Sequence, residues 1–133
     1  MSHPTELEKE WINDNQTYLS TRTPANLNQV LNFLKKNLDA SYVKEDSDGN
    51  TKDKYYELNN YGDWLNGVTS LTTFGAPATN TDTDGVVIVA GADRIQTDNG
   101  KRTFECTWID TWEETDLGKD WTCTGVKESV VEI

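Results

Sequence analysis

The sequence has few of the residues that carry metal and nucleophile chemistry. It contains one histidine, His3, and two cysteines, Cys106 and Cys123, among 133 residues. One histidine near a terminus excludes Ser–His and Cys–His nucleophile pairs, and two cysteines alone make no zinc signature. Gly91 falls inside an expected strand rather than in a phosphate-binding loop. We therefore expect no metal site and no cofactor.

Basic residues and long apolar runs are scarce as well. Twelve Lys and Arg stand against 23 Asp and Glu, a formal charge of −11. Nucleic-acid affinity comes largely from basic side chains, so this acidic protein is expected to bind neither nucleic acid nor an anionic membrane surface. No segment approaches the roughly 20 apolar residues of a membrane span, and the N-terminus lacks the apolar core of a signal peptide. We expect a cytoplasmic protein with reduced thiols.

The residues that are present indicate one α+β domain over 1–133. Five Trp, five Tyr and three Phe are enough to build a core. Apolar spacing predicts a helix over 5–18, with Thr5 as N-cap and Glu8 completing a capping box, and a second helix from Thr23-Pro24. A short strand over 41–44, a turn over 45–50 and a third helix capped by Thr51 follow. Residues 68–74 form a possible strand, and 78–85 read as a polar loop.

The last third of the chain predicts three long strands, over 86–96, 102–113 and 121–131. They are joined by turns at 98–100 and 116–120, and both turns contain glycine. Pairing Trp112 near Trp121 would place the two cysteines about four residues apart along the ladder, too far for a disulfide. On the middle strand one sheet face carries Phe104, Cys106, Trp108, Asp110 and Trp112.

Asp110 is a carboxylate within an apolar stripe. Burial between two tryptophans is costly unless the carboxyl group is paired or protonated, so Asp110 is either a pocket group or a residue at an exposed strand end. In the second case Lys127 or Arg94 would form an ordinary cross-strand ion pair with it. The sequence leaves both alternatives open.

The order of these elements resembles the nuclear transport factor two-like superfamily, and within it the SnoaL-like and ketosteroid-isomerase-like proteins. The likeness rests on four segments: Leu38–Lys52, Gly85–Gly91, Lys101–Trp108 and Asp120–Val131. The resemblance implies a cystatin-like α+β fold, in which a strongly bent antiparallel sheet wraps around the N-terminal helices as a cone. It also implies a largely apolar pocket and an outer sheet face through which two copies form a homodimer.

The resemblance further implies a set of site residues. In ketosteroid isomerases an Asp acts as general base, while a Tyr and a protonated Asp bind the enolate oxygen. By similarity Asp46 takes the place of the base, Asp110 that of the second Asp, and Tyr18 or Trp11 that of the Tyr. The expected ligand-binding residues are Trp11, Tyr42, Tyr55, Trp64, Arg94, Trp108 and Trp112.

The residues themselves offer simpler interpretations. Asp46 stands in Glu45-Asp46-Ser47-Asp48-Gly49, where Asp side chains favour turns by bonding their own backbone. Aromatic residues fill cores before they bind ligands, and Arg94 is expected to be exposed.

Two classes of function therefore remain. One is the binding of a small apolar or amphipathic molecule, with isomerase or dehydratase chemistry by carboxylate proton transfer. The other is a non-catalytic interaction or dimerisation module with an acidic surface and a filled cone.

Overall fold

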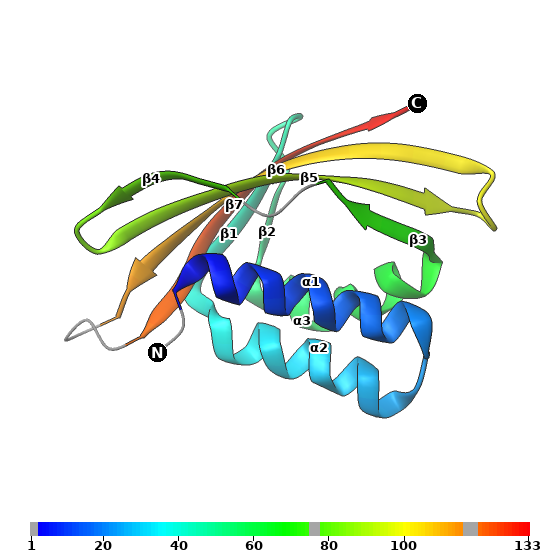
Figure 1. The fold of residues 1–133 in the computed structure, drawn as a ribbon, viewed down its shortest axis with the longest axis horizontal. Helices are drawn as coiled ribbons and strands as arrows, with labels where there is room; N and C mark the ends of the chain where they lie inside the picture. The colour runs from blue at the N-terminus through cyan, green and yellow to red at the C-terminus, as the bar shows by residue number, and fades with distance from the viewer. Residues whose placement is uncertain (1–2, 75–77, 116–119) are drawn as a thin grey trace.

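The computed structural model describes residues 3–74, 78–115 and 120–133, and in this part of the chain three helices cover one face of a curved sheet (Figure 1). The helices are α1 (Pro4–Ser20), α2 (Pro24–Asn37) and α3 (Lys54–Gly67). The strands are β1 (Leu38–Asp46), β2 (Thr51–Asp53), β3 (Val68–Thr73), β4 (Ala78–Thr83), β5 (Val86–Thr97), β6 (Arg102–Glu114) and β7 (Trp121–Glu132). The sheet runs in the order β2-β1-β7-β6-β5-β3, and β4 also pairs with β5. This is the expected α+β cone fold.

The sheet is mixed rather than wholly antiparallel. β1 and β7 are parallel, whereas the other pairs are antiparallel. Parallel neighbours need a crossover connection, and here everything between β1 and β7 serves as that connection. This pairing places pocket-lining residues of β1 beside those of β7, which lie more than 70 positions later in the sequence.

Of the three predicted helix N-caps, one is confirmed and two are wrong. Thr23 caps α2 as expected, since its side chain accepts from the backbone N–H of Asn26. The predicted cap of α1 at Thr5 is wrong, because the helix begins at Pro4 and His3 is its N-cap. The cap of α3 at Thr51 is also wrong. Residues 51–53 pair with β1 as the short strand β2, so α3 begins only at Lys54, with Asp53 as its cap.

The three long strands are confirmed, and β4 is an addition. The expected polar loop over 78–85 instead contains β4, which pairs along the first half of β5. The β5–β6 turn has positive φ at Asp98 (53°), Asn99 (57°) and Gly100 (85°). These are residue types that accept the left-handed region, which explains why the sequence signalled this turn clearly.

The predicted β6–β7 register is wrong, although its consequence for the cysteines holds. Trp112 pairs with Cys123, not with Trp121, because β6 continues to Glu114 and a bulge interrupts the ladder after Thr111. Cys106 lies opposite Val130, so the two thiols are further apart than predicted, and both are free and buried. Residues 116–119 of the predicted turn lie outside the described residues.

No helix in the described ranges is long and apolar enough to cross a membrane.

Candidate functional site

A cavity of about 510 Å³ lies between the helices and the inner face of the sheet. Side chains of α1 and α3 line it on one side, and those of β1, β5, β6 and β7 line it on the other. Its aromatic wall includes Trp11, Tyr56, Tyr61, Trp64, Phe104 and Trp108. A volume in the range of about 300 to 1,000 Å³, lined by aromatic groups with a few polar ones, is typical of small-molecule sites.

Two carboxyl groups, Glu8 and Asp110, meet in the cavity. Glu8 is 3% exposed and Asp110 is 4% exposed, and the indole N–H of Trp112 donates to Glu8 Oε1 at 2.9 Å. Burial raises the pKa of Asp110 well above its usual range, and the negative charge of Glu8 raises it further. Burial also raises the pKa of Glu8, while a hydrogen bond from Asp110 opposes that rise. The pKa values of both carboxyl groups are therefore raised, which favours a proton bound to the pair.

Two residues that line this cavity each have a buried polar atom without a hydrogen-bond partner in the protein. These atoms are Oδ1 of Asp110 and the hydroxyl of Tyr42, a residue that is 1% exposed. Burial and neighbouring negative charge raise the pKa of Tyr42, so the hydroxyl keeps its proton. Buried polar groups are nearly always paired in folded proteins, and each exception needs a reason.

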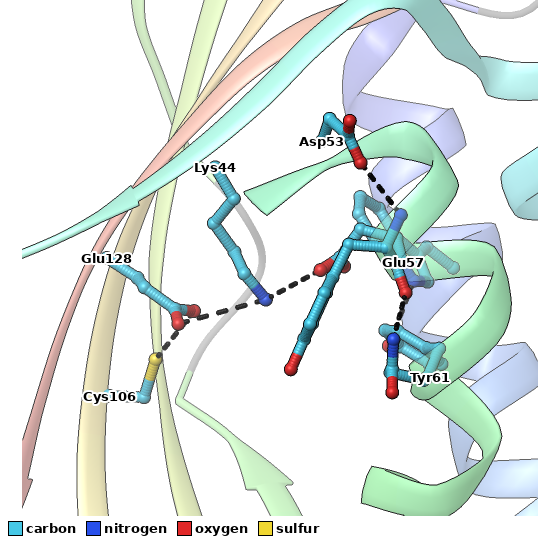
Figure 2. Close-up of polar contacts among 9 residues, drawn as sticks. Lys44, Asp53, Glu57, Tyr61, Cys106 and Glu128 are labelled. Carbon is cyan, nitrogen blue, oxygen red and sulfur yellow. Dashed lines mark hydrogen bonds and ion pairs between the residues drawn. The ribbon is translucent and has the colours of Figure 1, made fainter. Parts of the chain in front are cut away.

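Lys44 joins the sheet to α3 across the cavity (Figure 2). Its Nζ lies 3.2 Å from Glu57 Oε1 and 3.9 Å from Glu128 Oε1. Burial alone lowers the pKa of Lys44, but the charges of Glu57 and Glu128 outweigh it and raise the pKa. The Sγ of Cys106 lies 3.9 Å from Glu128 Oε2. Lys44 therefore keeps its positive charge and forms ion pairs with two carboxylates.

Asp93 completes the set of acidic groups in the cavity. It accepts a hydrogen bond from the hydroxyl of Thr73 at 2.9 Å, and burial raises its pKa. Two residues before it, Gly91 lies opposite Trp108 in the β5–β6 ladder. A Cβ at Gly91 would lie 2.3 Å from Cζ2 of Trp108, so only glycine lets the indole pack against β5 here.

The structure brings five of the predicted site residues to the cavity: Trp11, Tyr42, Trp64, Trp108 and Asp110. Of the two alternatives for Asp110, the structure shows a buried group at the pocket and not a residue at an exposed strand end. Neither Lys127 nor Arg94 pairs with it. Trp112 lies behind the cavity, fully buried, and reaches the site only through its hydrogen bond to Glu8.

Four other predicted residues do not line the cavity. Asp46 occupies the turn after β1, where its carboxylate accepts from the backbone N–H groups of Asp48 and Asn50, both at 2.9 Å. These hydrogen bonds stabilise the turn, which is the simpler role that the sequence indicates for Asp46. They also lower the pKa of Asp46. Asp46 therefore lies in a turn and not among the residues that line the cavity.

Three more of the expected site residues, Tyr18, Tyr55 and Arg94, also lie outside the cavity lining. Tyr18 is buried against Val30 and Leu65, away from the cavity, and donates to Asn66. Tyr55 is 76% exposed on α3. Arg94 points outward from β5 and pairs with Glu105 at 2.8 Å.

The polar residues of the cavity lining that the sequence reasoning missed include Glu8, Lys44, Glu57, Asp93 and Glu128. A signal existed for two of them. Lys44 follows Tyr42 by two residues on β1, and Glu128 follows Val126 by two on β7, so strand alternation puts each on the inner face. Glu8 was assigned to a capping box, which concealed its inward position.

These carboxylates do not form a metal centre. Among the described residues no group of three or more His, Cys, Asp and Glu side chains is arranged to hold a metal ion.

Comparison with known proteins agrees with the fold. No model of a protein family matches the chain, and no curated protein is similar to it in sequence. Solved structures do match. An NTF2-like protein of Cytophaga hutchinsonii has 13% identity and a TM-score of 0.62 over 98% of this chain and 100% of that one.

Two further structures give the same result. An NTF2-like superfamily protein of Salmonella enterica has 14% identity and a TM-score of 0.65, over 94% of this chain and 89% of its own. A protein named as a candidate ketosteroid isomerase, from Shewanella frigidimarina, has 13% identity and a TM-score of 0.63, over 90% of this chain and 91% of its own. The chain has the nuclear transport factor two-like fold. At such low identity the likeness concerns the fold alone.

Proposed function

We propose that this protein binds a small amphipathic molecule in its cone-shaped cavity. The observation that carries the proposal is a cavity of about 510 Å³ with an aromatic wall, whose lining includes two residues with unpartnered buried polar atoms, Asp110 Oδ1 and the Tyr42 hydroxyl. An unsatisfied buried polar atom costs about 1–3 kcal/mol. A ligand with its own polar group would recover that energy, and its apolar part would cover the aromatic wall.

The rival function, an interaction module with a filled cone, fits these features less well. A filled cone would leave no cavity between the helices and the inner face of the sheet. The cavity volume instead lies within the range typical of ligand sites.

The test is to detect binding and to locate it. A panel of neutral, cationic and anionic aromatic compounds is titrated into the protein while the indole N–H resonances of Trp11, Trp64 and Trp108 are followed by NMR. Val126 lines the cavity, and Val126→Phe should weaken binding at least tenfold by occupying its floor. Val131 is 57% exposed on the same strand, so Val131→Phe is the matched control. If no compound shifts these resonances, or if Val126→Phe binds as the wild type does, the proposal is wrong.

A second candidate function, proton transfer of the isomerase or dehydratase kind, is favoured by the Glu8–Asp110 pair. Two carboxyl groups that share one proton hold an acid and a base side by side. A ligand C–H next to Glu8 would then exchange with solvent. The test is exchange of a bound ketone's α-hydrogens in D₂O, measured by NMR. Exchange should be lost in Glu8→Gln and kept in Asp46→Asn; equal exchange in wild type and Glu8→Gln would refute this role.

We also propose that two copies associate through the outer face of the sheet. Ile109 on β6 is 45% exposed, and Val131 on β7 is exposed as well. Exposed aliphatic groups on a sheet face are common at subunit interfaces. Sedimentation equilibrium should find a dimer that Ile109→Lys converts to a monomer, and a monomeric wild type would overturn the proposal.

A further inference from the structure

Three carboxyl groups surround one indole on the inner face of the sheet. Asp110 follows Trp108 by two residues on β6, and Glu128 lies directly opposite Trp108 on β7. Asp93 follows Gly91, the residue opposite Trp108 on β5, by two. All three carboxyl groups line the cavity, and the three strands are neighbours in the sheet. Each is therefore on the same face as the indole and next to it.

The basic residues around the cavity do not balance this negative charge. Lys44 already forms ion pairs with both Glu57 and Glu128. The Nζ of Lys52 lies 5.2 Å from the centre of the Tyr56 ring, and Arg102 forms two hydrogen bonds to Glu132, so both cations already have partners. Even with one proton shared by Glu8 and Asp110, the carboxylates lining the cavity outnumber the cations that face them. An anionic ligand would meet net repulsion here, and a cation would meet attraction.

The unpartnered oxygen of Asp110 also favours a ligand that donates a hydrogen bond. Asp110 Oδ1 is buried and accepts no hydrogen bond from a donor of the protein. A ligand carbonyl would place a second acceptor beside it, whereas an N–H group would satisfy it. The side chain is 4% exposed, so water reaches it poorly. What this end of the cavity lacks is a donor.

We propose that the ligand is a small primary or secondary amine, bound as its ammonium ion beside Asp93, Asp110 and Glu128, with its apolar body against Trp11, Trp64 and Phe104. Trp108 adds an aromatic surface next to the charge, and indole is the side chain best suited to attract a cation. A metal ion is the poorer occupant, because the described carboxylates are not arranged to coordinate one. This inference rests on the proposed function and specifies the class of ligand.

The experiment compares three naphthalene compounds that differ only in charge. They are 2-naphthylmethylamine, 2-naphthylmethanol and 2-naphthoate, titrated at pH 7 and followed by NMR and calorimetry. The amine should bind at least tenfold more tightly than the alcohol, and the carboxylate should bind most weakly. If the alcohol or the carboxylate binds as tightly as the amine, the inference is wrong while the ligand pocket stands. If none of the three binds, the proposed function fails and the inference fails with it.

Two variants then assign the selectivity to particular residues. Asp93→Asn and Glu128→Gln should each weaken binding of the amine about tenfold, because each removes a negative charge without changing the shape of the side chain. Binding of the neutral alcohol should stay within twofold, which also shows that the pocket is intact. Asp63→Asn, at an exposed position of α3, is the matched control and should change neither. Unchanged amine affinity in both pocket variants would overturn the inference.

Discussion

Replacing Asp110 by Asn should flatten the dependence of stability on pH. Burial and the charge of Glu8 raise the pKa of Asp110, and burial raises that of Glu8. The ordinary pKa values of these groups are 3.8 and 4.5. Above about pH 4 the folded protein therefore keeps a proton that the unfolded chain has released. The free energy of unfolding of the wild type must fall as the pH rises through this window, up to the raised pKa of the pair.

The magnitude follows from the number of protons. A difference of one bound proton between folded and unfolded states changes the free energy of unfolding by about 1.4 kcal/mol per pH unit. An Asn at position 110 donates an N–H to Glu8, as the protonated acid does, but has no proton to lose. The stability of the variant relative to the wild type should thus rise by as much as about 1.4 kcal/mol for each pH unit within the window.

The assay is urea unfolding followed by tryptophan fluorescence at pH 5, 6, 7 and 8. Asp46→Asn is the control. The pKa of Asp46 is lowered, so its contribution to stability is lost only as the pH falls below its usual value of 3.8. Between pH 5 and 8 the Asp46→Asn profile should run parallel to that of the wild type. If the Asp110→Asn profile also runs parallel, the carboxyl pair does not share a proton and the reasoning fails.

Three further predictions concern stability and reactivity. Gly91→Ala should lower the free energy of unfolding by about 1–3 kcal/mol, because the new Cβ would lie 2.3 Å from a ring carbon of Trp108. Lys44→Met should lower it by about 3 kcal/mol, since it leaves Glu57, 4% exposed, without its ion-pair partner; urea titration measures both. Burial, with nearby carboxylates, raises the pKa of the Cys106 thiol to about 12, so iodoacetamide at pH 8 should alkylate it only after unfolding, as mass spectrometry would show.

Each of these has a matched control and an opposing outcome. No atom lies within 4 Å of a Cβ built at Gly67, so Gly67→Ala should leave the free energy of unfolding unchanged. If both glycine variants lose equal stability, contact with Trp108 is not the cause of the loss at Gly91. Arg94 pairs with Glu105 at side chains nearly half exposed, so Arg94→Met should cost less than about 1 kcal/mol. A Lys44→Met variant as stable as Arg94→Met would refute the buried pair. Rapid alkylation of the folded protein would refute the protection of Cys106.

The sequence by itself determined the elements whose signals are local. Alternation along β6 placed Cys106, Trp108, Asp110 and Trp112 on one face, and all four are buried in the structure. Thr23-Pro24 fixed the start of α2, and the run 98–100 fixed a hairpin. These features need only the backbone preferences of neighbouring residues, so a single sequence can specify them.

Features set by long-range pairing were not determined in that way. β4 is polar in composition and becomes a strand because the edge of β5 offers it hydrogen bonds. Helix α3 begins later than predicted because residues 51–53 pair with β1. The β6–β7 register differs from the predicted one because of a bulge. In each case partners far along the chain outweighed local propensity.

The site shows the same division. The sequence marked Asp110 as an acid that would need a partner if buried, but it did not identify that partner. Glu8 lies 102 positions earlier, on a helix face that local spacing assigned to a cap. Only the packing of α1 across the sheet places the two carboxyl groups together, with Trp112 donating to one of them. A shared proton depends on distance and burial, and the tertiary structure alone sets both.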